Sequence, residues 1–268
     1  MTIAGYTEFR AALPNRRLAV NNQAMASHQW GVNQIRLTAF PEPSATVNGA
    51  DWWQQLTGES PDTTVASPKL ASHQTQGSFQ DGTLALQIQP LRIDWLHAAT
   101  APEGMADFSG TLGPFVTVLP TFLELMLKWL SQPDCPSLQR IAFGTVLLMP
   151  VDSREEGYER LGAYLPFVKL DATHSSDFSY QINRPRQSNV FPPLLLNRLS
   201  KWSVGALQAL IASPSGIAIA GRQHHCRLEL DINTSAENTK TFPQDGVVKL
   251  FDELGALAAE ISDKGDIA

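Results

Sequence analysis

The chain has 268 residues, of which 43% are hydrophobic and 17% are charged, as is typical of a globular protein. Its formal net charge of −6 argues against a protein that coats nucleic acid. Cys135 and Cys226 lie far apart without a C-x-x-C spacing, which excludes a zinc-ribbon signature and a disulfide framework. We expect no secretory signal and no membrane span, and we predict a soluble cytoplasmic protein.

The first elements are predicted from alternation and capping signals. The extended pattern at 30–40 predicts a strand, and Asp51 is a suitable N-cap for a short helix over 50–56. Residues 57–81 are rich in Ser, Thr, Gln, Gly and Pro and contain few apolar residues, so we expect a long loop there.

The clearest strand signal lies at 83–98. Apolar residues alternate there with a period of two, which indicates a half-buried strand, and the parity changes at Gln89-Pro90. Because proline cannot donate a ladder hydrogen bond, we expect an edge position or a bulge at that point. The alternating residues are Leu84, Leu86 and Ile88, followed by Leu91, Ile93 and Trp95.

A helix and a buried strand are expected next. The apolar spacing over 114–130 predicts an amphipathic helix that ends before Pro133. Residues 141–151 are apolar on both parities, which is typical of a central strand covered on both faces. Shorter strands are predicted at 158–170 and 178–182.

The last third contains one ambiguous stretch. Residues 196–211 fit a helix or a strand, and we favour a strand because the turn at 213–216 suggests a hairpin. Residues 226–232 alternate regularly and predict a strand, and the spacing over 246–261 predicts a closing amphipathic helix.

These elements predict an α+β fold in which antiparallel sheet segments are packed by two long amphipathic helices, 114–130 and 246–261. Strands followed by a long helix occur in both parts of the chain, which suggests two structurally similar halves. We divide the chain into an N-terminal α+β half, 1–150, and a C-terminal α+β half, 151–268, with one continuous domain as the alternative.

Four segments carry a family resemblance. They are the strand LQIQPLRIDWLH, the helix GPFVTVLPTFLELMLKWL, the strand RIAFGTVLLMPV, and the ending CRLELDINT before FDELGALAAEISDKGD. In this order they resemble a sporadically distributed family of uncharacterised prokaryotic proteins of about this length, over most of residues 28–262. Members of that family close with a strand that reads L-D-I-D before a C-terminal helix. Here the strand reads Leu230-Asp231-Ile232-Asn233, which departs at the last position.

The resemblance implies no activity, cofactor or catalytic residue. The patchy distribution of the family resembles that of accessory genes in defence or mobile-element systems. What the resemblance implies is therefore a role in such a prokaryotic accessory system.

One group of residues suggests metal or thiol chemistry. His224 and Cys226 share one face of a predicted strand, and Asp231 follows on the same strand. A zinc site needs a third and a fourth ligand, and no partner motif supplies them. We favour the interpretation that Cys226 is a small core residue, that one neighbouring histidine is exposed and that the other lies at a strand end.

The distribution of acidic residues is more informative. No Asp or Glu occurs from Phe178 to Leu228. Arginine and lysine bind phosphates, and a flat ring stacks on a base, so this segment can bind nucleic acid or an acidic protein. The alternative is structural: a core tryptophan, and arginine stems that cover apolar surface. The residues concerned are Arg184, Arg186, Arg198, Lys201 and Trp202.

Trp52-Trp53 is a second candidate surface. Adjacent tryptophans on a short element are difficult to bury together, and an exposed tryptophan is a common interface anchor. The alternative is that one ring caps the core while the other lies under the neighbouring loop.

We predict a non-enzymatic binding and assembly subunit of a prokaryotic accessory system, of the anti-phage defence kind. The chain lacks a G-x-S-x-G elbow, a P-loop and a G-x-G-x-x-G motif. We predict no catalytic residue, no cofactor and no metal. The expected partners are proteins of a multi-subunit complex, or further copies of the chain, bound by segment 178–228 and Trp52-Trp53.

Two further hypotheses stay open. The first is a nucleic-acid-binding component that uses the basic residues of segment 178–228 and binds less tightly as salt rises. The second is an enzyme built around His224, Cys226 and Asp231, which requires a bound metal or a reactive thiol.

Overall fold

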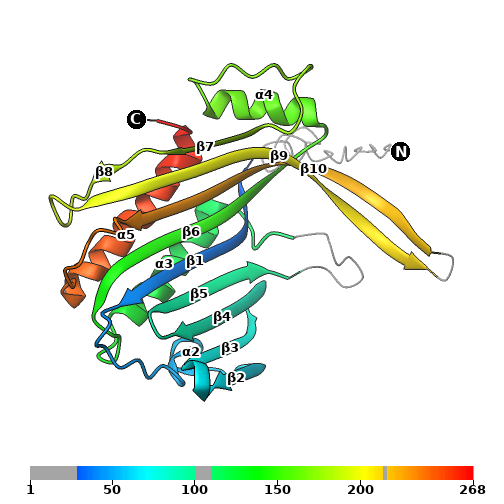
Figure 1. The fold of residues 1–268 in the computed structure, drawn as a ribbon. Helices are drawn as coiled ribbons and strands as arrows, with labels where there is room; N and C mark the ends of the chain where they lie inside the picture. The colour runs from blue at the N-terminus through cyan, green and yellow to red at the C-terminus, as the bar shows by residue number, and fades with distance from the viewer. Residues whose placement is uncertain (1–28, 101–109, 214–215, 268) are drawn as a thin grey trace, which may run out of the picture.

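The computed structural model describes residues 29–100, 110–213 and 216–267, and within 208–222 it describes the backbone alone. These residues form one ten-stranded antiparallel sheet in the order β2-β3-β4-β5-β1-β6-β10-β9-β7, and β8 also pairs with β9 (Figure 1). The strands are β1 (Gly31–Pro41), β2 (Thr63–Ser67), β3 (Ser72–Phe79), β4 (Gly82–Gln89), β5 (Arg92–Ala99), β6 (Leu138–Val151), β7 (Ser179–Asn183), β8 (Arg186–Gln187), β9 (Leu195–Ser213) and β10 (Gly216–Thr234). The helices of this part of the chain are α2 (Trp52–Thr57), α3 (Phe115–Leu130), α4 (Arg154–Tyr164) and α5 (Gln244–Lys264), with a 3₁₀ turn at Pro68–Leu70.

The predicted fold class is wrong. The protein is dominated by one continuous sheet, with 40% strand and 27% helix, and does not consist of sheet segments packed by two long helices. The ranges 114–130 and 246–261 are helical, but α3 and α5 are short beside the sheet that they cover. The polar strands between 57 and 81 and the very long β9 and β10 supply the additional sheet. The proposed division at residue 150, which lies within β6, stays a prediction.

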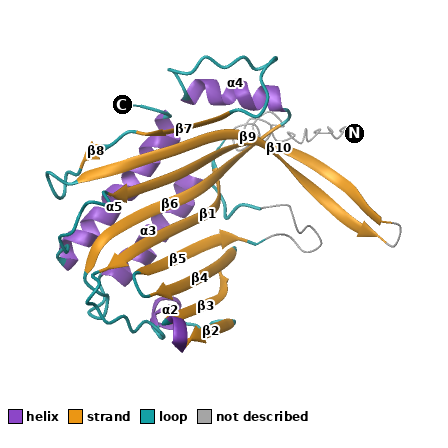
Figure 2. Cartoon of the chain, in the orientation of Figure 1, coloured by secondary structure: helices purple, strands orange, loops and turns teal. Residues whose placement is uncertain are grey.

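The sheet has one covered face and one open face. On the covered face, apolar side chains such as Ile35, Phe143 and Leu228 are fully buried. Helices α3 and α5 pack on this face over the central strands (Figure 2). The residues of opposite parity, such as Arg36, Gly144 and Glu229, form the open face. Since neighbouring side chains of a strand point to opposite faces, the apolar alternation fixes which face each strand buries.

The predicted long loop at 57–81 is wrong. Strands β2 and β3 form a hairpin there at one edge of the sheet. Every residue of β2 is exposed or half-buried, so no apolar alternation marks it in the sequence. An edge strand with so little buried surface resembles a loop in composition.

The pattern at 83–98 belongs to two strands. Strands β4 and β5 pair as a hairpin, and Pro90 and Leu91 form the turn between them. The change of parity, where we expected an edge position or a bulge, therefore marks a reversal of the chain. Proline is favoured in tight turns because its φ angle is fixed.

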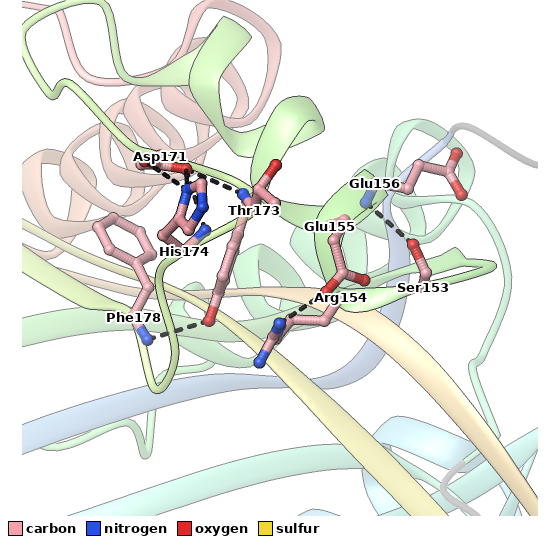
Figure 3. A network of polar contacts seen from close by, with 9 residues as sticks. Ser153, Arg154, Glu155, Glu156, Asp171, Thr173, His174 and Phe178 are labelled. Carbon is pink, nitrogen blue, oxygen red and sulfur yellow. Dashed lines mark hydrogen bonds and ion pairs between the residues drawn. The ribbon is translucent and has the colours of Figure 1, made fainter.

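The predicted strand at 158–170 is also wrong, because residues 154–164 form α4. The Ser153 Oγ accepts a hydrogen bond from the Glu156 backbone N at 3.1 Å and caps the helix (Figure 3). Glu155 and Glu156 lie in the first turn, where they complement the helix dipole. The short helix buries only Gly157, Tyr158 and Leu161, too few to give a clear helical period.

The ambiguous stretch at 196–211 is a strand, as predicted. It forms β9, which pairs with β10 over its whole length. In the described part of the chain, no helix is both long enough and apolar enough to cross a membrane.

The centre of the covered face near α3 is an aromatic cluster, and it gives a stability prediction. The Trp129 ring meets Trp52 at 5.4 Å and Trp95 at 6.0 Å, both edge to face, and it is fully buried. We expect Trp129→Ala to lower the free energy of unfolding by about 3–5 kcal/mol, because it leaves a large cavity. Chemical denaturation measures the loss, and Glu124→Ala, exposed on the same helix, should change it by less than about 0.5 kcal/mol.

Candidate protein-binding site

Strands β9 and β10 run well beyond the rest of the sheet. Strand β7 pairs with β9 only as far as Ser203, and β6 pairs with β10 only from His224 onward. Residues 204–213 and 216–223 therefore form a two-stranded projecting arm, which leaves the sheet at one end (Figure 1). At about 3.3 Å per residue, an arm of this length extends roughly 25 Å.

The sequence of the projecting arm is apolar, and Arg222 near its base is the one charged residue between 204 and 223. From Trp202 to Gly221 no Asp, Glu, Lys or Arg occurs, and most residues are Ala, Leu, Ile, Ser or Gly. Natural proteins usually protect exposed strand edges with charges, prolines or bulges. Within the described strands, the shift in register between Ile219 and Gly221 and the charge of Arg222 are such devices. Both edges of the arm therefore carry backbone donors and acceptors that another strand can pair with.

The base of the arm is held rigidly on the covered face. The Trp202 indole stacks on Tyr164 of α4 at 5.6 Å and meets Trp30 edge to face at 6.1 Å. A Cβ on Gly157 would lie 2.8 Å from Val204, so α4 approaches β9 as closely as a glycine permits. The Cys226 Sγ donates to the Gly157 carbonyl oxygen at 3.4 Å. These contacts fix the direction in which the arm leaves the sheet.

The loop that follows α4 is fastened by local hydrogen bonds. The Asp171 carboxylate accepts from the backbone N of Thr173 and of His174, each at 3.0 Å (Figure 3). The hydrogen bond from His174 is the main cause that lowers the pKa of Asp171. Farther along, the Phe178 backbone N donates to the Tyr158 hydroxyl at 3.3 Å, which ties the loop to the helix before β7 begins.

The predicted basic segment is neutralised by acidic residues from elsewhere in the chain. The Arg184 guanidinium donates to both carboxylate oxygens of Asp266, which follows α5, and the Tyr180 hydroxyl donates to the same carboxylate at 2.9 Å. The Arg186 Nη1 donates to Glu260 of α5 at 2.8 Å. These arginines therefore fasten the end of α5 to β7 and β8.

Arg198 lies beneath the same helix and is almost fully buried. Its Nη2 is 3.6 Å from the Glu260 carboxylate, an ion pair that is too long for a hydrogen bond. Burial lowers the pKa of Arg198, and the charge of Arg186 lowers it further. A buried guanidinium in this position contacts α5 and is covered from a macromolecular partner.

Lys201 and Trp202 lie on opposite faces of β9. The Lys201 ammonium is on the open face and pairs with Glu229 of β10 at 3.1 Å. Trp202 is fully buried on the covered face, where its Nε1 donates to the Ser200 Oγ at 3.0 Å. The five predicted residues of this segment therefore do not share one surface. The three arginines contact the end of α5, Lys201 lies on the open face, and Trp202 is buried on the covered face.

Trp52 and Trp53 are both 1% exposed, so the expectation that adjacent tryptophans resist common burial is wrong. The Trp52 Nε1 donates to Asp134 at 2.7 Å, and the Trp53 Nε1 donates to the Leu84 carbonyl oxygen at 3.2 Å. A Cβ on Gly49 would lie 2.2 Å from the Trp52 ring, and one on Gly77 would lie 2.7 Å from the Trp53 ring. Two glycines thus make room for the two indoles.

The residues of the proposed thiol or metal site do not converge. Cys226 is buried on the covered face, whereas Asp231 has the opposite parity and lies on the open face. Burial raises the pKa of the Cys226 thiol to about 12, which keeps it protonated at neutral pH. Within the described residues, no group of three or more His, Cys, Asp and Glu side chains is placed to hold a metal ion.

The clamp between Arg184 and Asp266 gives a prediction for stability and its pH dependence. The hydrogen bonds from Arg184 are the main cause that lowers the pKa of Asp266 below its ordinary value of 3.8. A carboxylate of this kind stabilises the fold above pH 3.8 and loses its contribution as pH falls through the lowered pKa.

We therefore expect Asp266→Asn to lower the free energy of unfolding by about 2 kcal/mol at pH 7. The difference from the wild type should shrink as pH falls below 3.8. Urea denaturation over a pH series measures both. Asp263→Asn is the matched control, because Asp263 is exposed and has no ion pair among the described residues. A constant difference at all pH values would contradict the ionic origin of the effect.

Comparison with known proteins adds no relative. No protein-family model matches this chain, and no curated protein matches it. The resemblance to a family of uncharacterised prokaryotic proteins therefore stays a prediction.

Proposed function

We propose that this chain is a non-enzymatic assembly subunit that binds protein through the projecting arm. The observation that carries the proposal is the long hairpin, uncharged from Trp202 to Gly221, whose two edges have no neighbouring strand in the described structure. Such an edge is unfavourable for an isolated protein, because it promotes pairing with other chains. Pairing with a partner strand satisfies the exposed backbone donors and acceptors and forms a specific interface.

The partner that fits the arm best is a second copy of the chain. Two copies related by a twofold axis place the same strand edge against itself in antiparallel orientation, which is the pairing used throughout this sheet. Apart from Arg222 near its base, the arm carries no charge, so two arms meet along most of their length without like-charge repulsion. The rigid base formed by Trp202, Tyr164 and Trp30 keeps the edge in a fixed orientation and lowers the entropic cost of pairing.

The alternative of nucleic-acid binding by segment 178–228 stays a prediction. Arg184 and Arg186 are paired with carboxylates, Arg198 is buried, and Lys201 pairs with Glu229. These contacts favour a structural role for the same residues. The expected role in anti-phage defence rests on the family resemblance alone and is likewise a prediction.

The proposal predicts the oligomeric state of the full chain. We expect a dimer at micromolar concentration in sedimentation equilibrium, because edge-to-edge pairing of the arms joins two copies. Ile211→Lys and Ile219→Lys introduce a charge into the arm and should raise the dissociation constant at least about tenfold.

The matched control is Val65→Lys on β2, which also places lysine at an exposed apolar position of a sheet edge. It should leave the dimer intact. Circular dichroism should show unchanged melting for all three variants. A wild-type chain that remains monomeric up to about 100 μM would contradict the proposal.

A further inference from the structure

A hollow of about 220 Å³ lies at the centre of the open face, away from the projecting arm. It is formed by five neighbouring strands of the sheet, from β1 to β7. Four charged side chains and two glutamines line it: Arg36, Lys201, Glu229, Asp231, Gln34 and Gln181.

Gly144 explains why the face is hollowed at this point. In the sheet register it lies between Arg36 of β1 and Asp231 of β10, and it has no side chain to fill the space between them. A Cβ at this position would lie 3.0 Å from the Arg36 Nη2, so the guanidinium reaches over the glycine. The hollow is therefore bounded by a cation on one side and a carboxylate on the other.

Arg36 differs from its cationic neighbours on the open face. Lys201 and Arg227 pair with Glu229, and Arg92 pairs with Asp94. Among the described residues, Arg36 has neither an ion pair nor a hydrogen bond, and its Nε is buried without a partner. A guanidinium offers a planar fork of donors that matches the two oxygens of a carboxylate.

Asp231 supplies the complementary charge. One of its oxygens accepts a hydrogen bond from the Asn233 amide at 2.9 Å, which orients the carboxylate. The amides of Asn197 and Asn183 continue this chain of hydrogen bonds across β9 to β7. Glu229 lies two residues away on the same face of β10. The second wall of the hollow therefore accepts a cation or a strong hydrogen-bond donor.

From this arrangement we propose that the hollow binds a small zwitterion of the α-amino acid class. The ligand carboxylate pairs with Arg36, and the ligand ammonium pairs with Asp231 across Gly144. The volume fits a small ligand, because pockets for drug-sized ligands span about 300–1,000 Å³. An internal segment of a peptide lacks the two adjacent charged groups, so the chemistry selects a free amino acid.

Isothermal titration calorimetry of the full chain with each of the standard amino acids tests the proposal. At least one should bind with a dissociation constant of about 1 mM or lower. The matching amine without a carboxylate, and the matching acid without an amine, should each bind at least about tenfold more weakly.

Two variants locate the site. Arg36→Met removes the guanidinium and Gly144→Ala fills the hollow, and each should weaken binding at least about tenfold. Arg140→Met is the matched control, because Arg140 also lies on the open face but stacks on Phe40 at 4.6 Å and does not line the hollow. Unchanged melting temperatures show that the variants fold. The proposal is overturned if no amino acid binds at about 10 mM, or if Arg36→Met binds as tightly as the wild type.

Discussion

Strand β6 is the constraint on which the rest of the structure depends. It is hydrogen-bonded to β1 on one side and to β10 on the other, and nearly all of its residues are buried on both faces. Because a slip by one residue would move the buried side chains of a strand to the other face, the register of β6 fixes that of both neighbours. The positions of α5 and of the projecting arm follow from these two pairings.

The fold brings together acidic and basic residues that are far apart in the sequence. The segment from Phe178 to Leu228 lacks carboxylates, but α5 and the residues that follow it bring Glu260 and Asp266 to its arginines. Acidic residues more than 70 positions away in the sequence therefore supply the negative charge that this segment lacks. Arg36, on a strand that looked ordinary in the sequence, has no ion pair or hydrogen bond among the described residues.

The elements predictable from the sequence were those with a regular or continuous apolar pattern. The helices of 114–130 and 246–261 and the strands of 141–151 and 226–232 follow periodic apolar patterns, and the structure contains each of them. The edge strand β2 and its neighbour β3 were missed because they bury little, and α4 was missed because its apolar residues are few. The burial of Trp52 and Trp53 depends on the close approach of Gly49 and Gly77. Gly77 is distant from both rings in the chain, and neither glycine by itself indicates that a ring is buried.

The candidate sites could be predicted only in part, for a related reason. The uncharged run of the arm is visible in the sequence, but its projection depends on where β6 and β7 stop pairing. The hollow depends on cross-strand register, which places Arg36, Gly144 and Asp231 in one row from three separate strands. No spacing within the sequence encodes such a row.

The central place of β1 has a consequence for how the chain folds. Strands β2 to β5 pair with neighbours in the sequence, whereas the Thr145 side chain bonds to the Gln34 backbone across 111 residues. Distant pairings must overcome a larger loss of chain entropy, and proteins dominated by them fold slowly. The meander from β2 to β5 can form as soon as its own residues are available. We expect the pairing of β1 with β6, which joins the two parts of the sheet, to form later.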